Sequence, residues 1–105
     1  MTDFIMVYVT TASSGEAEDI ATALVEAKLA ACVNVLGPIA SVYRWQGEVK
    51  QAREILVMAK TRKALFDKVR DKVKEHHDAE TPCIVAYPMV DGDQSFLDWI
   101  AKETS

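Results

Sequence analysis

Cysteine is scarce in this sequence, and long apolar runs are absent from it. The two cysteines, Cys32 and Cys83, lie far apart in strand-like apolar segments. Small secreted domains that rely on disulfides are much denser in cysteine, so we expect two reduced thiols. No apolar run approaches the roughly 20 residues of a membrane-spanning helix, and no secretion signal opens the chain. The sequence therefore predicts a cytoplasmic protein with no membrane partner.

The sequence also has fewer positive than negative charges, and it lacks catalytic motifs. Twelve lysines and arginines against 16 acidic residues give a formal net charge of -4. That balance offers no basic surface for a nucleic-acid backbone, so we expect no nucleic-acid partner. The four glycines form no phosphate-binding loop, and no nucleophile stands beside a base and an oxyanion donor. We therefore do not expect an enzyme.

What the chain does contain is enough apolar sequence for one core. Half of its 105 residues are hydrophobic and 27% are charged, as in an ordinary globular domain. The length suits one domain, and no linker or low-complexity tract divides it. We expect a single domain over residues 1–105.

Periodicity predicts the elements of the first half. An unbroken apolar run, Phe4 to Thr10, indicates a strand buried on both faces in the middle of a sheet. Ser13 stands three residues before Glu16 in a capping-box pattern, which starts a helix expected over Gly15 to Ala30.

A long hairpin follows. Strand residues run from Cys32 to Leu36, bend at Gly37-Pro38, and continue with alternating side chains to Trp45. Gln46-Gly47 predicts a tight turn into a strand over Glu48 to Ala59. The two strands should form a ribbon that projects beyond the sheet.

The second half predicts two helices and one more strand. Thr61 is the expected cap of a helix whose apolar stripe leads to His76-His77. A strand over Cys83 to Tyr87 and a short helix capped by Asp93 complete the chain. This order predicts an α+β, ferredoxin-like split βαβ sandwich with an extended β-hairpin and a short C-terminal helix.

The block from Lys28 to Gly47, KLAACVNVLGPIASVYRWQG, is the most distinctive segment of the chain. It resembles the CutA family of divalent-cation tolerance proteins. Further family positions follow in the expected order: Glu54, Lys60-Thr61, His76-His77, Thr81-Pro82, Pro88, Gly92 and Leu97-Asp98-Trp99-Ile100. The likeness spans nearly the whole chain. It implies a homotrimer in which strands pair across subunits, associated with tolerance of copper and other divalent cations.

Tyr43 and Trp45 are candidates for the trimer interface. They alternate along one side of the expected ribbon, and a two-stranded ribbon alone is marginal in water. Either a partner chain covers these rings, or they fold back over a helix of the same subunit. The resemblance favours assembly, and it implies that Trp45 and Lys60 border a cleft between subunits.

His76 and His77 are candidate metal ligands, since imidazole is a good donor for copper and zinc. The alternative is that they only face the negative end of a helix dipole, and neighbouring positions on a helix point to different sides. The resemblance implies ligands at both positions, for copper or another divalent cation.

Three positions depart from the family pattern: Thr10 replaces a cysteine found in some members, Ala79 a tyrosine and Cys83 a glutamate. A softer site that combines His77 with Cys83, with Asp78 as a candidate third member, would favour reduced copper or zinc. The alternative for Cys83 is a small buried hydrophobe at a strand start, and Cys32 is expected in the core.

These observations favour a metal-binding protein without catalytic turnover. The alternative is a trimeric sensor similar to the PII signalling proteins, which bind small molecules between subunits. An acylphosphatase-like hydrolase shares the predicted fold, but the segment Thr11 to Ser14 lacks the arginine that such an enzyme needs after its first strand.

Overall fold

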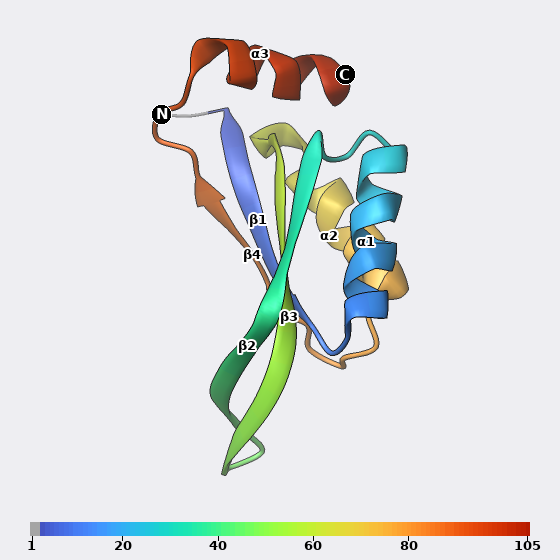
Figure 1. Ribbon diagram of the computed structural model, residues 1–105, viewed down its shortest axis with the longest axis vertical. Coiled ribbons are helices and arrows are strands. Elements are labelled where there is room, and N and C mark those ends of the chain that lie inside the picture. The colour runs from blue at the N-terminus through green and yellow to red at the C-terminus, as the bar shows by residue number, and fades with distance from the viewer. Residues whose placement is uncertain (1–2) are drawn as a thin grey trace.

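Four strands form one antiparallel sheet in the order β2-β3-β1-β4. The structure, a computed structural model, describes residues 3–105 (Figure 1). Along the chain the elements are β1 (Phe4–Thr11), α1 (Ser14–Glu26), β2 (Cys32–Trp45), β3 (Glu48–Arg62), a short 3-10 helix (Lys63–Leu65), α2 (Phe66–His76), β4 (Ile84–Pro88) and α3 (Gln94–Glu103). The predicted α+β ferredoxin-like topology is confirmed.

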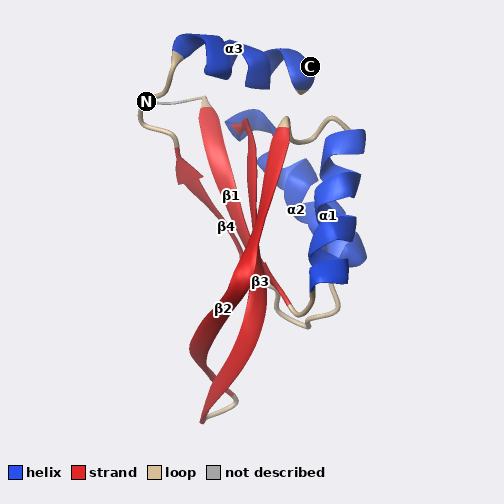
Figure 2. Cartoon of the chain, in the orientation of Figure 1, coloured by secondary structure: helices blue, strands red, loops and turns tan. Residues whose placement is uncertain are grey.

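The helices α1 and α2 cover one side of the sheet, and α3 lies across one end of it (Figures 1 and 2). Along β1 the side chains alternate between buried and half-buried, so only one face belongs to the core. The prediction that this strand is buried on both faces is therefore wrong, because none of the described helices covers its second side. Its place inside the sheet, between β3 and β4, is confirmed. The core consists of Ile5, Val7, Val9, Ala17, Ile20, Leu24, Ala30, Val57, Ala59, Val69 and Val73.

The side of the sheet that α1 and α2 leave uncovered is here termed the open face, and every second residue of each strand lies on it. Directly opposed residues of antiparallel strands share a face, so the strand register shows which residues belong to the open face. They include Met6, Tyr8, Thr10, Cys32, Asn34, Leu56, Met58, Lys60, Val85 and Tyr87. This face is largely apolar, and several of its side chains are solvent-exposed.

Helix α1 ends four residues before the predicted Ala30. Lys28 adopts a left-handed conformation with φ 59°, which the helix cannot continue through. Its N–H donates to the carbonyl of Val25 at 3.0 Å, and the Leu29 N–H donates to that of Leu24 at 2.9 Å. These two bonds form a Schellman ending, usually built on glycine. Because a lysine occupies that position, the sequence pattern gave no sign that the helix ends there.

The start of the second helix also differs from the prediction. Thr61 lies within β3, opposite Ile5, and is fully buried. The chain leaves the sheet only after Arg62, through the 3-10 helix, and α2 begins without a side-chain cap. Thr61 as a helix cap is therefore wrong, because its pairing with β1 holds it in the sheet.

The hairpin has the predicted form and extends well beyond the helices (Figure 2). Two residues of β2, Gly37 and Pro38, bulge out between the pairs Leu36–Leu56 and Ile39–Glu54. At the tip, Gln46 and Gly47 have φ 50° and 82°. A type I′ turn requires positive φ at both of its central residues, as found here. The bend and the turn are both confirmed.

The last helix is fixed at both ends. Asp93 accepts a hydrogen bond from the Phe96 N–H at 3.2 Å, as predicted for its cap. The Ser95 hydroxyl and this N–H lower the pKa of the Asp93 carboxyl. At the other end the Arg62 guanidinium donates to the hydroxyl and carbonyl oxygens of Thr104. These contacts attach α3 to the end of β3.

Candidate functional site

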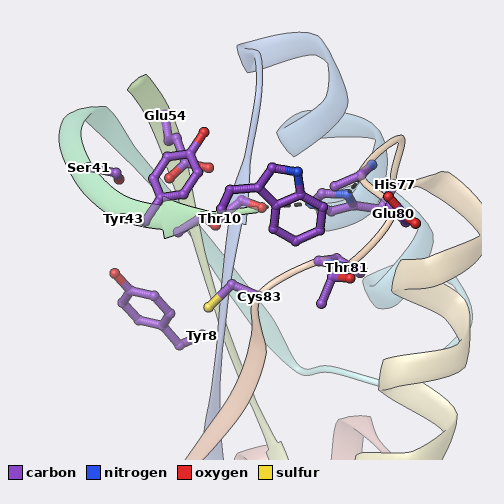
Figure 3. A pocket seen from close by; sticks show the side chains of 12 residues that line it. Tyr8, Thr10, Ser41, Tyr43, Glu54, His77, Glu80, Thr81 and Cys83 are labelled. Atoms are coloured by element: carbon purple, nitrogen blue, oxygen red, sulfur yellow. Dashed lines mark hydrogen bonds between the residues drawn. The ribbon is translucent and has the colours of Figure 1, made fainter. Parts of the chain in front are cut away.

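The candidate site is a pocket of about 610 Å³ between the base of the hairpin and the α2–β4 loop (Figure 3). Its volume lies in the usual range for small-molecule sites. Three segments line it: the C-terminal half of β1, the hairpin, and the loop that leads into β4. The lining residues are Tyr8, Thr10, Ser41, Tyr43, Trp45, Glu54, His77, Ala79, Glu80, Thr81, Pro82 and Cys83.

Both ring nitrogens of His77 have backbone partners. Nε2 lies 2.7 Å from the carbonyl oxygen of Thr10, which can only accept, so Nε2 carries a proton. Nδ1 accepts a hydrogen bond from the Ala79 N–H at 3.1 Å. The ring is therefore neutral, and its side chain is only 5% exposed. His77 links the α2–β4 loop to the end of β1.

The carboxylate of Glu16 joins the same loop to the start of α1. Oε1 accepts from the Ala12 N–H at 3.0 Å, and Oε2 accepts from the Asp78 N–H at 3.1 Å. Ser13 caps the helix as predicted, through a hydrogen bond from the Glu16 N–H. Glu16 Oε1 lies 3.9 Å from His77 Nε2, too far for a hydrogen bond. Together Glu16 and His77 hold one wall of the pocket in place.

The structure brings together some of the predicted site residues and separates others. His77, Cys83, Tyr43 and Trp45 all line the pocket, whereas His76 and Lys60 do not. His76 is the last residue of α2, and its side chain is exposed.

The two cysteines lie in different surroundings. Cys83 is an exposed free thiol in the pocket wall, so its interpretation as a buried hydrophobe is wrong. It directly precedes β4, at an end of the sheet that the helices of the described part of the chain leave uncovered. Cys32 is half-buried on the open face, 4.0 Å from Lys60 Nζ, and does not belong to the core. Cys32 is not in the core because α1 and α2 do not cover the open face.

The hairpin aromatics are not buried by helices of their own chain. Tyr43 is 45% exposed and Trp45 is 37% exposed. Of the two alternatives that the sequence left open, folding back over a helix is therefore wrong. Both rings instead form the hairpin side of the pocket.

The donors in the pocket suit a transition metal in kind, but one chain does not assemble them into a site. The lining supplies a thiol, an imidazole and two carboxylates, from Cys83, His77, Glu54 and Glu80. Such donors bind zinc and copper. Within residues 3–105, however, no three histidine, cysteine or acidic side chains are placed to hold a metal ion. Binding would require a shift of the loop, or a ligand from another subunit.

Sequence reasoning missed the contribution of Tyr8, Glu54 and Glu80 to the pocket and the long-range role of Glu16. Glu16 was visible only as part of a local capping pattern, and its bond to Asp78 joins segments far apart in sequence. The strand register would have signalled Tyr8, because its alternation places it on the open face. Nothing local marked Glu54 or Glu80 as facing the same space.

Among the described residues, no helix is long and apolar enough to cross a membrane.

Residues 5–103 match the model of a family described as CutA1 divalent ion tolerance protein. The chain is 43% identical over 99 residues to the divalent-cation tolerance protein CutA of Thermus thermophilus, covering 94% of this chain and 96% of that one. It is 49% identical over 94 residues to the protein of that name from Archaeoglobus fulgidus, covering 90% and 91%.

Solved structures of proteins with these descriptions superpose closely on the chain. A structure of the CutA from Archaeoglobus fulgidus, described as periplasmic, has a TM-score of 0.94 at 45% identity and covers 97% of this chain and 99% of that one. The Cut A1 protein of Thermus thermophilus has a TM-score of 0.95 at 42% identity, with the same coverage.

Proposed function

Because the chain belongs to the CutA1 family of divalent ion tolerance proteins, we propose that it binds a divalent cation as a homotrimer in the cytoplasm, with copper as the leading candidate. The family is described by tolerance of ions and not by a reaction. The proposed role is therefore binding without turnover. A cytoplasmic location suits the exposed free thiol of Cys83, which a reducing compartment preserves.

The observation that supports a metal site is that His77 and Cys83 line the same pocket. Metal-bound histidines commonly donate their second ring N–H to a backbone carbonyl, which fixes the ring. His77 makes that bond to Thr10, so Nδ1 is the nitrogen with a lone pair. Its partner, the exposed Ala79 N–H, can be released to water when the loop moves. Nδ1 and the thiolate of Cys83 then provide the nitrogen and sulfur donors, and His76 is the proposed third ligand from the end of α2.

Copper binding tests the site directly. We expect the reduced protein to bind about one copper ion per chain in competition with a chelator of known affinity. Replacing Cys83 by serine should weaken binding at least tenfold, because the soft donor is lost. Cys32→Ser is the matched control and should leave the affinity unchanged, since Cys32 lies outside the pocket. Equal losses in the two variants, or no loss in either, would refute the site.

The open face and the hairpin support the proposal of a trimer. A largely apolar sheet face with exposed aromatics at its margin needs a cover, and unpaired edge strands invite pairing with another chain. Tyr43 and Trp45 lie on one side of the hairpin, in register with Lys50 and Glu48. The proposed interface includes both rings, and Lys60 lies near the cleft that it forms.

Self-association is measured by sedimentation equilibrium. The expected mass is three times that of the 11.6 kDa chain. Tyr43→Arg should weaken association about tenfold, because it places a charge where a ring is covered. Val42→Arg, one residue away on the opposite side of the ribbon, is the control. A monomeric parent protein, or equal effects of the two substitutions, would contradict the proposed interface.

A second candidate function is the binding of a small molecule, as in the PII-like trimers. The size of the pocket and its aromatic hairpin wall favour it. Trp45 lies both in this pocket and at the proposed subunit boundary, so the ligand would sit where a signal can pass between subunits.

A further inference from the structure

The pocket is acidic and has no cation of its own. Of the described residues that line it, Glu54 and Glu80 are ionisable acids and none is lysine or arginine. The imidazole of His77 is neutral, because its Nδ1 accepts a hydrogen bond. The side chains of the lining therefore contribute two negative charges beside three aromatic rings.

Glu54 is the more informative of the two acids. It is half-buried in β3, on the hairpin side of the pocket and opposite Ile39. Within residues 3–105 its carboxylate takes part in no hydrogen bond or ion pair. Carboxylates that lose part of their hydration are normally paired with a donor. The free acceptor faces the cavity together with Tyr43 (Figure 3).

Two lysines of the same strand are engaged elsewhere. Lys60, on the open face of the same strand, donates to the amide oxygen of Asn34. Lys50, also on β3, forms an ion pair with Glu48 at 3.3 Å near the tip of the hairpin. Neither residue lines the pocket. No protein group among the described residues therefore neutralises Glu54.

We propose that this pocket binds an organic ammonium ion with an apolar substituent. The ammonium group pairs with Glu54, and Glu80 adds to the negative potential at the mouth. The rings of Tyr8, Tyr43 and Trp45 contact the apolar part and attract the charge through cation–π interaction. This inference rests on the small-molecule proposal above and does not require a metal.

The same features argue against the other ligand classes. A nucleotide or another anion meets two carboxylates and finds no arginine, lysine or helix N-terminus in the lining. A hard divalent metal ion requires about six oxygen donors around one point, and within residues 3–105 no three histidine, cysteine or acidic side chains are placed to hold a metal ion. An alkylammonium ion uses both the charge and the rings.

A set of three probes with one carbon skeleton separates charge from shape. 2-Phenylethylammonium is the cation, 2-phenylethanol the neutral analogue and phenylacetate the anion. Each is titrated into metal-free protein that carries Trp99→Phe, which leaves Trp45 as the only tryptophan fluorophore. We expect saturable quenching by the cation, at least tenfold weaker binding of the alcohol, and no saturation by phenylacetate. Equal affinities for the cation and the alcohol, or no saturable binding of the cation, would overturn the inference.

Charge-neutral substitutions test the role of the acids. Glu54→Gln should weaken binding of the cation at least tenfold while leaving the alcohol unaffected. Glu48→Gln is the matched control, since it lies on the same strand outside the pocket. The double variant Glu54→Gln, Glu80→Gln should lose the preference for the cation. If the preference survives in the double variant, or if Glu48→Gln weakens binding as much as Glu54→Gln, the assignment is wrong.

Metal binding is kept apart from this test because the three probes are titrated into metal-free protein and copper is titrated separately. Failure of copper to bind would then refute the metal proposal alone. Failure of the cation to bind would refute this inference alone.

Discussion

Replacing Gly37 by alanine is expected to lower the free energy of unfolding by about 3 kcal/mol. Two costs combine at this position. The backbone has φ 149°, which side-chain-bearing residues rarely adopt, and such strain costs about 1–3 kcal/mol. A Cβ atom would also lie 2.9 Å from Ile55 Cδ1 and 3.2 Å from the Glu54 carbonyl oxygen, and overpacking costs about 1–3 kcal/mol.

Two other glycines provide controls for this experiment. Gly47 has φ 82°, but no atom lies within 4 Å of the position that a Cβ would take, so Gly47→Ala should show only the strain, about 1 kcal/mol. Gly15 lies in α1 with only Ser13 Oγ nearby, so Gly15→Ala should stabilise by about 0.5–1 kcal/mol. Urea unfolding at one protein concentration measures all three. If Gly37→Ala costs no more than Gly47→Ala, the close approach to Ile55 is not a constraint.

Replacing His77 by leucine is expected to cost about 2 kcal/mol of stability. The substitution leaves the part-buried carbonyl of Thr10 without its donor, and such a group costs about 1–3 kcal/mol. The Ala79 N–H is exposed, so water replaces its lost partner cheaply. Amide hydrogen exchange should also rise in the α2–β4 loop, which loses its attachment to β1.

The neighbouring histidine is the control for this prediction. His76→Leu changes an exposed side chain at the end of α2 and should alter stability by less than about 0.5 kcal/mol. Comparable losses in the two variants would mean that the bond between His77 and Thr10 contributes nothing specific. Copper affinity is better tested at Cys83, because a substitution of His77 changes the loop as well as the donor.

The elements that the sequence predicted well are those with a strong local pattern. The run beginning at Phe4, the turn at Gln46-Gly47 and the cap at Asp93 each carry their own signal, and all three occur in the structure. Two of the failures lie at helix boundaries. Lys28 ends α1 in a conformation normally given to glycine, and pairing with β1 keeps Thr61 in the sheet. Local hydrogen bonds close the first helix around a lysine, a residue that does not signal such an ending, whereas the second outcome depends on a tertiary contact that no local window contains.

The candidate site was predictable only in part, for a similar reason. His77 and Cys83 were recognisable from residue chemistry, and the resemblance drew attention to their positions. The partner of His77 is a backbone carbonyl 67 positions away, which no side-chain pattern reveals. Glu54 gained significance only when the strands placed it beside the hairpin aromatics without a counter-ion.

The strand order β2-β3-β1-β4 has a consequence for symmetry. It gives the sheet two unlike edges, a 14-residue β2 and a 5-residue β4. Joining like edges about a twofold axis makes a pair and stops there, whereas contacts between unlike surfaces repeat around a ring until it closes. In a threefold ring every subunit presents both surfaces, so one substitution is copied into three equivalent junctions. A small change in the free energy of one junction would then be counted three times in the stability of the whole assembly.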